Sequence, residues 1–124
     1  VQLGYSVSFR SLVVKMTSAT IVNYSTVDFS SKNDMEITIM RWNNEQKSKY
    51  LPELKKKGMI RHAMLRIWNK EGVYRLGFIF EYRDEKAYKE CQPIWQEIER
   101  LNPETPAKIF ANRGLVLDNN VLSD

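Results

Sequence analysis

Apolar residues recur at every second position through the middle of the chain, which is the spacing of a β-strand. Segment 73–82 shows this best, because its even positions are all large and apolar: Tyr74, Leu76, Phe78, Phe80 and Tyr82. A second β-rich segment, 60–68, precedes it, and the loop between them ends in a glycine at position 72. The two segments therefore predict a β-hairpin.

The spacing changes to that of a helix after Asp84, a residue type that suits a helix N-cap. The apolar residues that follow fall on one side of a helix over 85–101: Ala87, Tyr88, Cys91, Ile94, Trp95, Ile98 and Leu101. Pro93 interrupts this pattern and predicts a kink or a break near Gln92. A last strand is predicted over 107–117, with Gly114 at a bulge or bend.

The first half of the chain is less regular. Segment 20–29 is rich in β-forming residues, and a polar cluster that suits a helix cap follows it. Residues 35–57 favour a helix that bends at Pro52 and ends before Gly58, although 36–39 also alternate like a strand. We interpret 1–18 as an N-terminal extension that could add a strand, 19–118 as the domain and 119–124 as a tail.

The order of elements is strand, helix, strand, strand, helix, strand. This order predicts an α+β fold of the ferredoxin-like, split β-α-β kind, with a four-stranded antiparallel sheet and two helices on one face. The side chains at the even positions of 73–82 should meet the helices, and those at the odd positions are partly apolar and partly charged. There, Glu81 is expected to form an ion pair near Arg75. A sheet face with large side chains is rarely left in water, so we expect a homodimer through the open face.

Composition narrows the setting of the protein. No window reaches the roughly 18 apolar residues of a membrane span. Cys91 is the single cysteine, which favours a reducing compartment, and we expect a cytoplasmic protein. Cys91 also falls on the apolar side of its helix, so we expect a buried, inert thiol. Neither Cys91 nor His62 has further ligand residues at the spacing of a metal site, and no metal is predicted.

Candidate site residues come from residue type and strand position. His62 is the only histidine, and it is either a general base or a packed residue. Alternation places His62, Arg66 and Trp68 on one face of the hairpin. With Tyr74 and Tyr82 of the following strand, Arg66 and Trp68 are the predicted ligand-binding residues.

Three short segments carry a resemblance to a known group. They are a lysine-rich helix end before an aliphatic strand (56–60), an aromatic strand that leads into a helix (80–87), and an Arg-Gly-Leu-Val strand (113–116). With these, the chain resembles the dimeric α+β barrel superfamily over residues 19–118. The resemblance implies a homodimer whose sheets face each other, and a ligand cavity between sheet and helices. The group includes cofactor-independent monooxygenases, haem-degrading enzymes, isomerases and stress-response proteins.

The monooxygenase and haem-degrading branch implies three residues that can be compared. Asn23 matches the asparagine of the first strand. Tyr82 stands where that branch has a tryptophan, and Gln92 stands where it has a histidine. Because haem iron needs an axial side-chain ligand, haem breakdown is disfavoured and no cofactor is predicted.

The sequence leaves three functional hypotheses. The first is binding of a small apolar or aromatic molecule between sheet and helices. If the protein is an enzyme, it would be a cofactor-independent monooxygenase or isomerase in which Asn23 polarises a substrate oxygen and His62 moves a proton. The second is RNA binding, which the poor stacking surface of Gly77 and Ile79 and the modest net charge of +4 argue against. The third is a non-catalytic ligand-binding or assembly protein.

Overall fold

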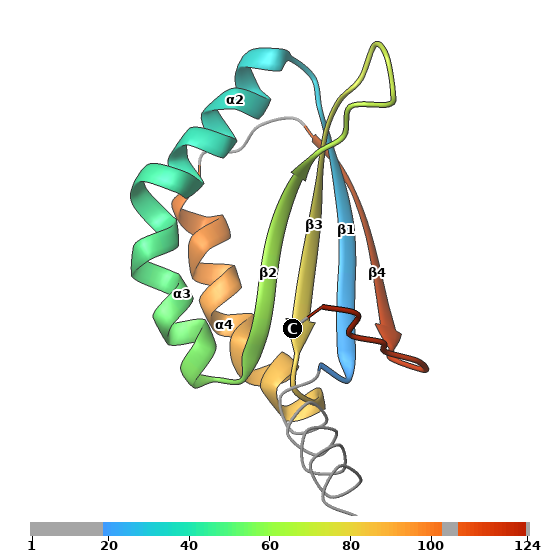
Figure 1. Ribbon diagram of the computed structural model, residues 1–124. Helices are drawn as coiled ribbons and strands as arrows, with labels where there is room; N and C mark the ends of the chain where they lie inside the picture. Colours follow the sequence, from blue (N-terminus) through green and yellow to red (C-terminus); the bar gives the residue numbers. More distant parts are fainter. Residues whose placement is uncertain (1–18, 103–106, 124) are drawn as a thin grey trace, which may run out of the picture.

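The computed structural model describes residues 19–102 and 107–123, so the strand considered within 1–18 lies outside the described residues. The elements follow the predicted order (Figure 1). They are β1 (Ile21–Phe29), α2 (Lys32–Arg41), the π-helical segment η1 (Trp42–Gln46), α3 (Lys47–Lys56), β2 (Met59–Arg66), β3 (Tyr74–Tyr82), α4 (Glu85–Leu101) and β4 (Ala107–Leu115).

The four strands form one antiparallel sheet in the order β2-β3-β1-β4. The helices all lie on one side of it, and β2 and β4 are its edges (Figure 1). This arrangement confirms the ferredoxin-like α+β fold. No helix in the described part of the chain is both long and apolar enough to cross a membrane.

The first helical segment is continuous from α2 to α3, with a π-helical turn between them. Ser31 caps it, because its hydroxyl accepts a hydrogen bond of 3.1 Å from the Asp34 backbone N–H. The strand alternative for 36–39 is therefore wrong. At Pro52, where a bend was predicted, α3 continues through the proline, and an irregular turn lies upstream at Trp42–Gln46.

The last helix, α4, begins at the predicted cap. The Asp84 carboxylate accepts a hydrogen bond of 2.8 Å from the Ala87 backbone N–H. Of the kink or break predicted near Gln92, the break is wrong, because α4 continues through Pro93 to Leu101. Its apolar side packs on the sheet as predicted, except that Leu101 remains 53% exposed at the end of the helix.

The turn between α3 and β2 is close to α4. Gly58 adopts φ +103°, a conformation that favours glycine, and a Cβ atom there would lie 2.6 Å from Cβ of Ala87. The turn therefore needs glycine for its backbone shape and for space.

The irregular point of the sheet is in β2 rather than β4. Of the bulge or bend predicted at Gly114, the bulge is wrong, because Gly114 pairs with Val22 in regular register. The register shifts instead between Met59 and Arg61, which leaves Ile60 as the extra residue of a bulge. This sets His62 opposite Phe80.

Candidate functional site

The two faces of the sheet have different surroundings. We call the side that packs against the helices the helix face and the other the open face. On β3, Leu76 and Tyr82 are fully buried on the helix face, and Phe78 and Phe80 are half-buried beside them. The predicted orientation of the even positions is therefore confirmed.

A ring cluster occupies the helix face near β2. Its members are Trp42 of η1, His62 of β2, Phe78 and Phe80 of β3, and Trp95 of α4; we call them the aromatic cluster. His62 is in contact with every other member. Its ring centroid lies 4.9 Å from that of Trp42, 5.1 Å from Phe80 and 5.2 Å from Trp95. The π-helical turn places the buried Trp42 over the imidazole, which the sequence did not reveal.

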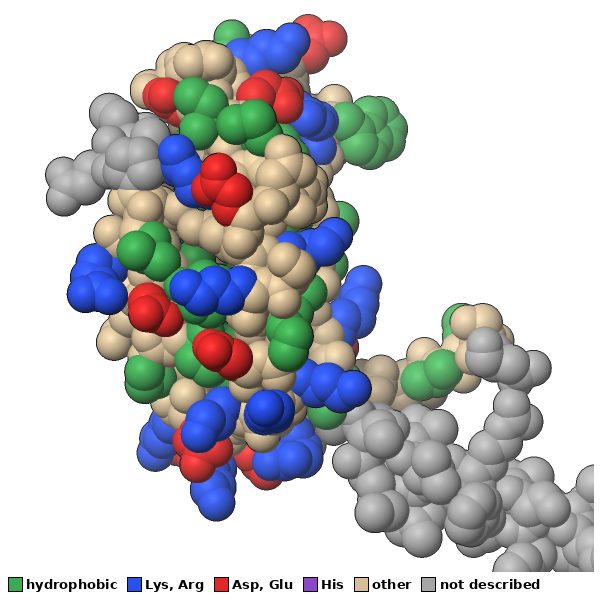
Figure 2. Space-filling view, turned by 90° about the vertical axis from the view of Figure 1, so that its left-hand side faces the viewer, with side chains coloured by type: hydrophobic (Ala, Val, Ile, Leu, Met, Phe, Trp, Pro, Cys, Tyr) green, Lys and Arg blue, Asp and Glu red, His purple; other side chains and the backbone are tan. Residues whose placement is uncertain are grey.

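A groove of about 430 Å³ opens beside this cluster, between α3 and the edge of β2. Its lining combines apolar and basic side chains: Leu51, Lys55, Gly58, Met59, Ile60, Arg61, His62 and Arg83. Lys and Arg side chains gather at the end of the molecule where α3 ends and α4 begins (Figure 2). We call this feature the β2-edge groove, and His62 is the residue that joins it to the aromatic cluster.

His62 is neutral in this setting. Burial takes the imidazole away from water and lowers its pKa to about 4. No described residue forms a hydrogen bond with its ring nitrogens. A neutral imidazole has one N–H donor and one acceptor nitrogen. It can orient a bound molecule, but a pKa this low makes it a weak base at neutral pH.

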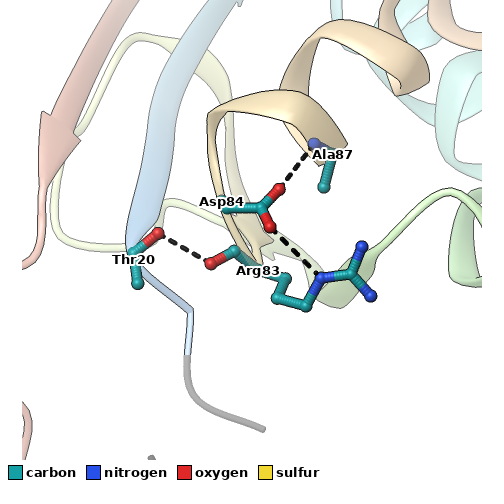
Figure 3. Close-up of polar contacts among 4 residues, drawn as sticks. All are labelled: Thr20, Arg83, Asp84 and Ala87. Atoms are coloured by element: carbon teal, nitrogen blue, oxygen red, sulfur yellow. Dashed lines mark hydrogen bonds and ion pairs between the residues drawn. The ribbon is translucent and has the colours of Figure 1, made fainter. Parts of the chain in front are cut away.

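Arg83 is a cation of the groove whose backbone is anchored through both its N–H and its carbonyl (Figure 3). Its backbone N–H donates to the Gly58 carbonyl at 2.9 Å, and its own carbonyl accepts a 2.7 Å hydrogen bond from the Thr20 hydroxyl. Its Nε lies 3.4 Å from the Asp84 carboxylate. The first two contacts anchor the backbone of Arg83, and the third orients its guanidinium, which stays half exposed.

Asn23 shares a cross-strand row with His62 but does not meet it. The row runs His62, Phe80, Asn23, Arg113 across β2, β3, β1 and β4. Two strand spacings of about 4.8 Å separate the backbones of Asn23 and His62, and Phe80 stands between them. The Asn23 amide oxygen accepts a 3.1 Å hydrogen bond from Ser25.

Tyr82 lies in the core beneath α4, 1% exposed. Burial raises the pKa of its phenol, although Trp95 and Gln92 lie close enough to oppose that shift. The indole Nε1 of Trp95 is nevertheless buried without a hydrogen bond of normal geometry among the described residues, as is the Tyr50 hydroxyl. Tyr82 therefore supports the aromatic cluster and does not line the groove.

The other predicted ligand-binding residues lie away from the groove. Arg66 forms a two-point ion pair with Glu36 of α2, at 2.6 and 3.2 Å. Tyr74, at the start of β3, is partly exposed. Trp68 lies beyond the end of β2 in the hairpin loop and is 88% exposed. Strand alternation placed Trp68 on the same face as His62, but β2 ends at Arg66 and the alternation ends with it.

Cys91 is fully buried, and burial raises the pKa of its thiol to about 11. A thiol with this pKa stays protonated at neutral pH and is a poor nucleophile. Among the described residues, no group of three or more His, Cys, Asp or Glu side chains could hold a metal ion.

The open face has an apolar middle with ion pairs at both ends. Tyr24 of β1 and Phe110 of β4 are 41% and 57% exposed there, next to Val22 and Ile79. Arg61 pairs with Glu81 at 2.7 Å near one end. At the other, Arg75 donates to Asp28 at 2.9 Å, and this hydrogen bond lowers the pKa of the Asp28 carboxyl. Glu81 thus pairs across the strands as expected, but with Arg61 and not Arg75.

The fold has close counterparts among solved structures. A dimeric ferredoxin-like protein from an uncultured marine organism is 26% identical, covers 82% of this chain and 99% of its own, and has a TM-score of 0.75. A second dimeric ferredoxin-like protein of the same kind of source is 27% identical over 82% and 98% of the two chains, with a TM-score of 0.70.

A monooxygenase from Streptomyces coelicolor, solved in complex with the ligand nanaomycin D, is 10% identical. It covers 85% of this chain and 94% of its own, with a TM-score of 0.61, and this likeness concerns the fold alone. No curated protein matches the chain. The likeness to these three solved structures confirms, for the fold, the resemblance to dimeric α+β barrels and antibiotic-biosynthesis monooxygenases.

A family model settles where the sequence belongs. It matches residues 18–116, which include the whole sheet, the helices and the β2-edge groove. The chain belongs to the family described as "Domain of unknown function (DUF6974)".

Proposed function

We propose that this protein is a homodimer that binds a small, largely aromatic molecule in the β2-edge groove, against the aromatic cluster. The groove carries this proposal, because its volume of about 430 Å³ lies in the range of small-molecule sites. Its apolar wall of Leu51, Met59 and Ile60 leads to a neutral imidazole that can donate or accept one hydrogen bond.

The homodimer rests on the open face. The two marine proteins described above as dimeric share about a quarter of their residues with this chain and the same fold. An apolar face such as the one around Tyr24, Ile79 and Phe110 is buried at low cost against a second copy, because a two-fold axis brings the same surface from both subunits together. Sedimentation across a wide range of protein concentration tests it. A protein that stays monomeric throughout would contradict the dimer.

Binding in the groove is tested by calorimetry with naphthamide, a neutral two-ring probe. Leu51→Trp places a larger side chain in the groove. We expect it to weaken binding by about tenfold or more, which is the loss of affinity expected when a buried aromatic contact is removed. Leu101→Trp is the matched control, because Leu101 lies at the exposed end of α4 and does not line the groove. Equal affinity in the two variants would place the ligand elsewhere.

A non-catalytic role fits these residues better than acid–base catalysis. His62 is a weak base, and Asn23 stands two strands away with its oxygen engaged by Ser25. The enzymatic alternative, cofactor-independent oxidation or isomerisation, is tested directly. For oxidation, a dihydroxynaphthalene and dioxygen would give a hydroxynaphthoquinone and water, with no other reductant. Enzyme-dependent oxygen uptake that is lost in both Asn23→Ala and His62→Gln would favour it.

Nucleic-acid binding would compete with the dimer for the same surface. β3 offers no stacking aromatic on the open face, but Tyr24 of β1 and Phe110 of β4 each provide one. In the proposed homodimer both rings are covered. Tight binding of an oligonucleotide by a monomer, lost in Tyr24→Ala, would replace the homodimer proposal.

A further inference from the structure

The β2-edge groove carries positive charge as well as apolar surface. Three of its lining residues, Lys55, Arg61 and Arg83, are cations, and none of its lining residues is an acid. The same groove has the apolar wall of Leu51, Met59 and Ile60, which leads to the imidazole of the aromatic cluster. A neutral aromatic molecule would contact the apolar wall and leave the three cations without a partner in the ligand.

The three cations differ in how far they are already paired. Arg61 forms a 2.7 Å ion pair with Glu81, so its charge is largely compensated. Arg83 contacts Asp84 through Nε alone, and no described residue accepts a hydrogen bond from its two terminal nitrogens. No described residue forms an ion pair with Lys55. Two cations of the groove therefore have donors to offer a ligand.

The backbone of Arg83 is also anchored in advance of binding. Its backbone is anchored to Gly58 and Thr20, as Figure 3 shows for the Thr20 contact. A Cβ atom on Gly58 would lie 3.1 Å from Nη2 of Arg83, so the missing side chain leaves room for the guanidinium. A cation that is held in place loses less conformational freedom when it binds an anion.

The chemistry of these groups defines the ligand class. A guanidinium presents two parallel N–H groups that match a carboxylate, and a lysine ammonium adds a point charge. We propose that the groove binds an aromatic carboxylate, with its rings against Met59 and His62 and its carboxylate between Lys55 and Arg83. This inference rests on the proposed function, since it concerns the same groove and names the charge of its ligand.

The test compares naphthoate with naphthamide, which have nearly the same shape and differ in charge. We expect naphthoate to bind at least tenfold more tightly at low ionic strength, because charge-assisted hydrogen bonds are stronger than neutral ones. Added salt should weaken naphthoate binding and leave naphthamide binding unchanged. In NMR titrations, bound naphthoate should also raise the pKa of His62, whereas naphthamide should not.

Matched variants locate the effect. Lys55→Ala combined with Arg83→Gln should abolish the preference for naphthoate and keep the affinity for naphthamide. Lys56→Ala combined with Lys86→Gln removes the same charge from residues outside the groove lining and should keep the preference. Equal affinities in the unmodified protein, or equal losses in the two double variants, would overturn the inference and leave the groove proposal intact. Binding of neither probe would overturn the proposed function itself.

Discussion

The two faces of one sheet show two ways of removing apolar side chains from water. On the helix face, the chain covers Leu76 and Tyr82 with its own helices, and both are fully buried. On the open face of the same strands, the apolar middle around Tyr24 and Ile79 has no cover from the described part of the chain. The helix face therefore determines whether a subunit folds, and in the proposed homodimer the open face determines whether two subunits associate.

The largest expected difference between the faces is in subunit stability. Leu76→Ala opens a cavity under α2 and should lower the free energy of unfolding by about 2–5 kcal/mol. Ile79→Ala, on the other face of the same strand, should cost a single subunit much less. Urea denaturation at low protein concentration measures both. Equal losses would mean that both faces are buried within one subunit.

A second effect of burial on the helix face depends on pH. The His62 pKa of about 4 lies below the ordinary 6.5, so between these pH values the unfolded chain binds a proton that the folded chain does not. The stabilising contribution is fully present above pH 6.5. It is lost as the pH falls towards 4, and amounts to at most about 3 kcal/mol.

The contribution of His62 is measured by comparing how the free energy of unfolding depends on pH in the wild type and in His62→Gln. The wild type should lose more stability than the variant as the pH falls from 6.5 to 4. An NMR titration of His62 with a midpoint near 6.5 would mean that the imidazole stays in contact with water.

The open face is tested by a charge at its centre. Tyr24→Glu brings two carboxylates together across the two-fold axis and should weaken the homodimer on the order of a hundredfold, about 2.8 kcal/mol. Tyr74→Glu is the control, because Tyr74 is 39% exposed and Tyr24 is 41%, but Tyr74 lies on the helix face. Sedimentation equilibrium compares the two. If both variants stay dimeric, the interface lies elsewhere.

The smallest expected effect concerns the ion pair at one end of the open face. The hydrogen bond from Arg75 holds the pKa of Asp28 below its usual value. Arg75→Gln should raise that pKa towards the ordinary range with a smaller loss of stability than the variants above, because the pair keeps about a quarter of its side-chain surface in contact with water. An unchanged Asp28 pKa in a carboxyl-detected NMR titration would mean that the pair does not persist in solution.

The sequence predicted the fold because the fold follows from local patterns. The alternation over 73–82 and the helical spacing after Asp84 depend on residues close in the chain, and they identified the elements and the helix face of β3. The bulge at Ile60 and the π-helical turn at Trp42 were missed, because both adjust the backbone to packing partners that are distant in sequence.

The site was only partly predictable for the same reason. His62 was identified by its rarity, and it does line the groove. Lys55 and Arg83 were not among the predicted site residues, because they come together only when the end of α3 meets the start of α4. Trp68 was proposed because the strand was extended too far, past the point where β2 ends. The sequence did offer one signal for Arg83 as a site residue, because this polar residue follows directly after an aromatic strand.

The most direct measurement is a ¹H–¹⁵N NMR titration of the protein with naphthamide, followed at the imidazole of His62 and the tryptophan indoles. A ligand in the β2-edge groove should shift His62, Trp42 and Trp95 along one saturable curve and leave the exposed Trp68 unchanged. Shifts at Trp68 or Tyr24 with His62 unmoved would contradict binding at the aromatic cluster.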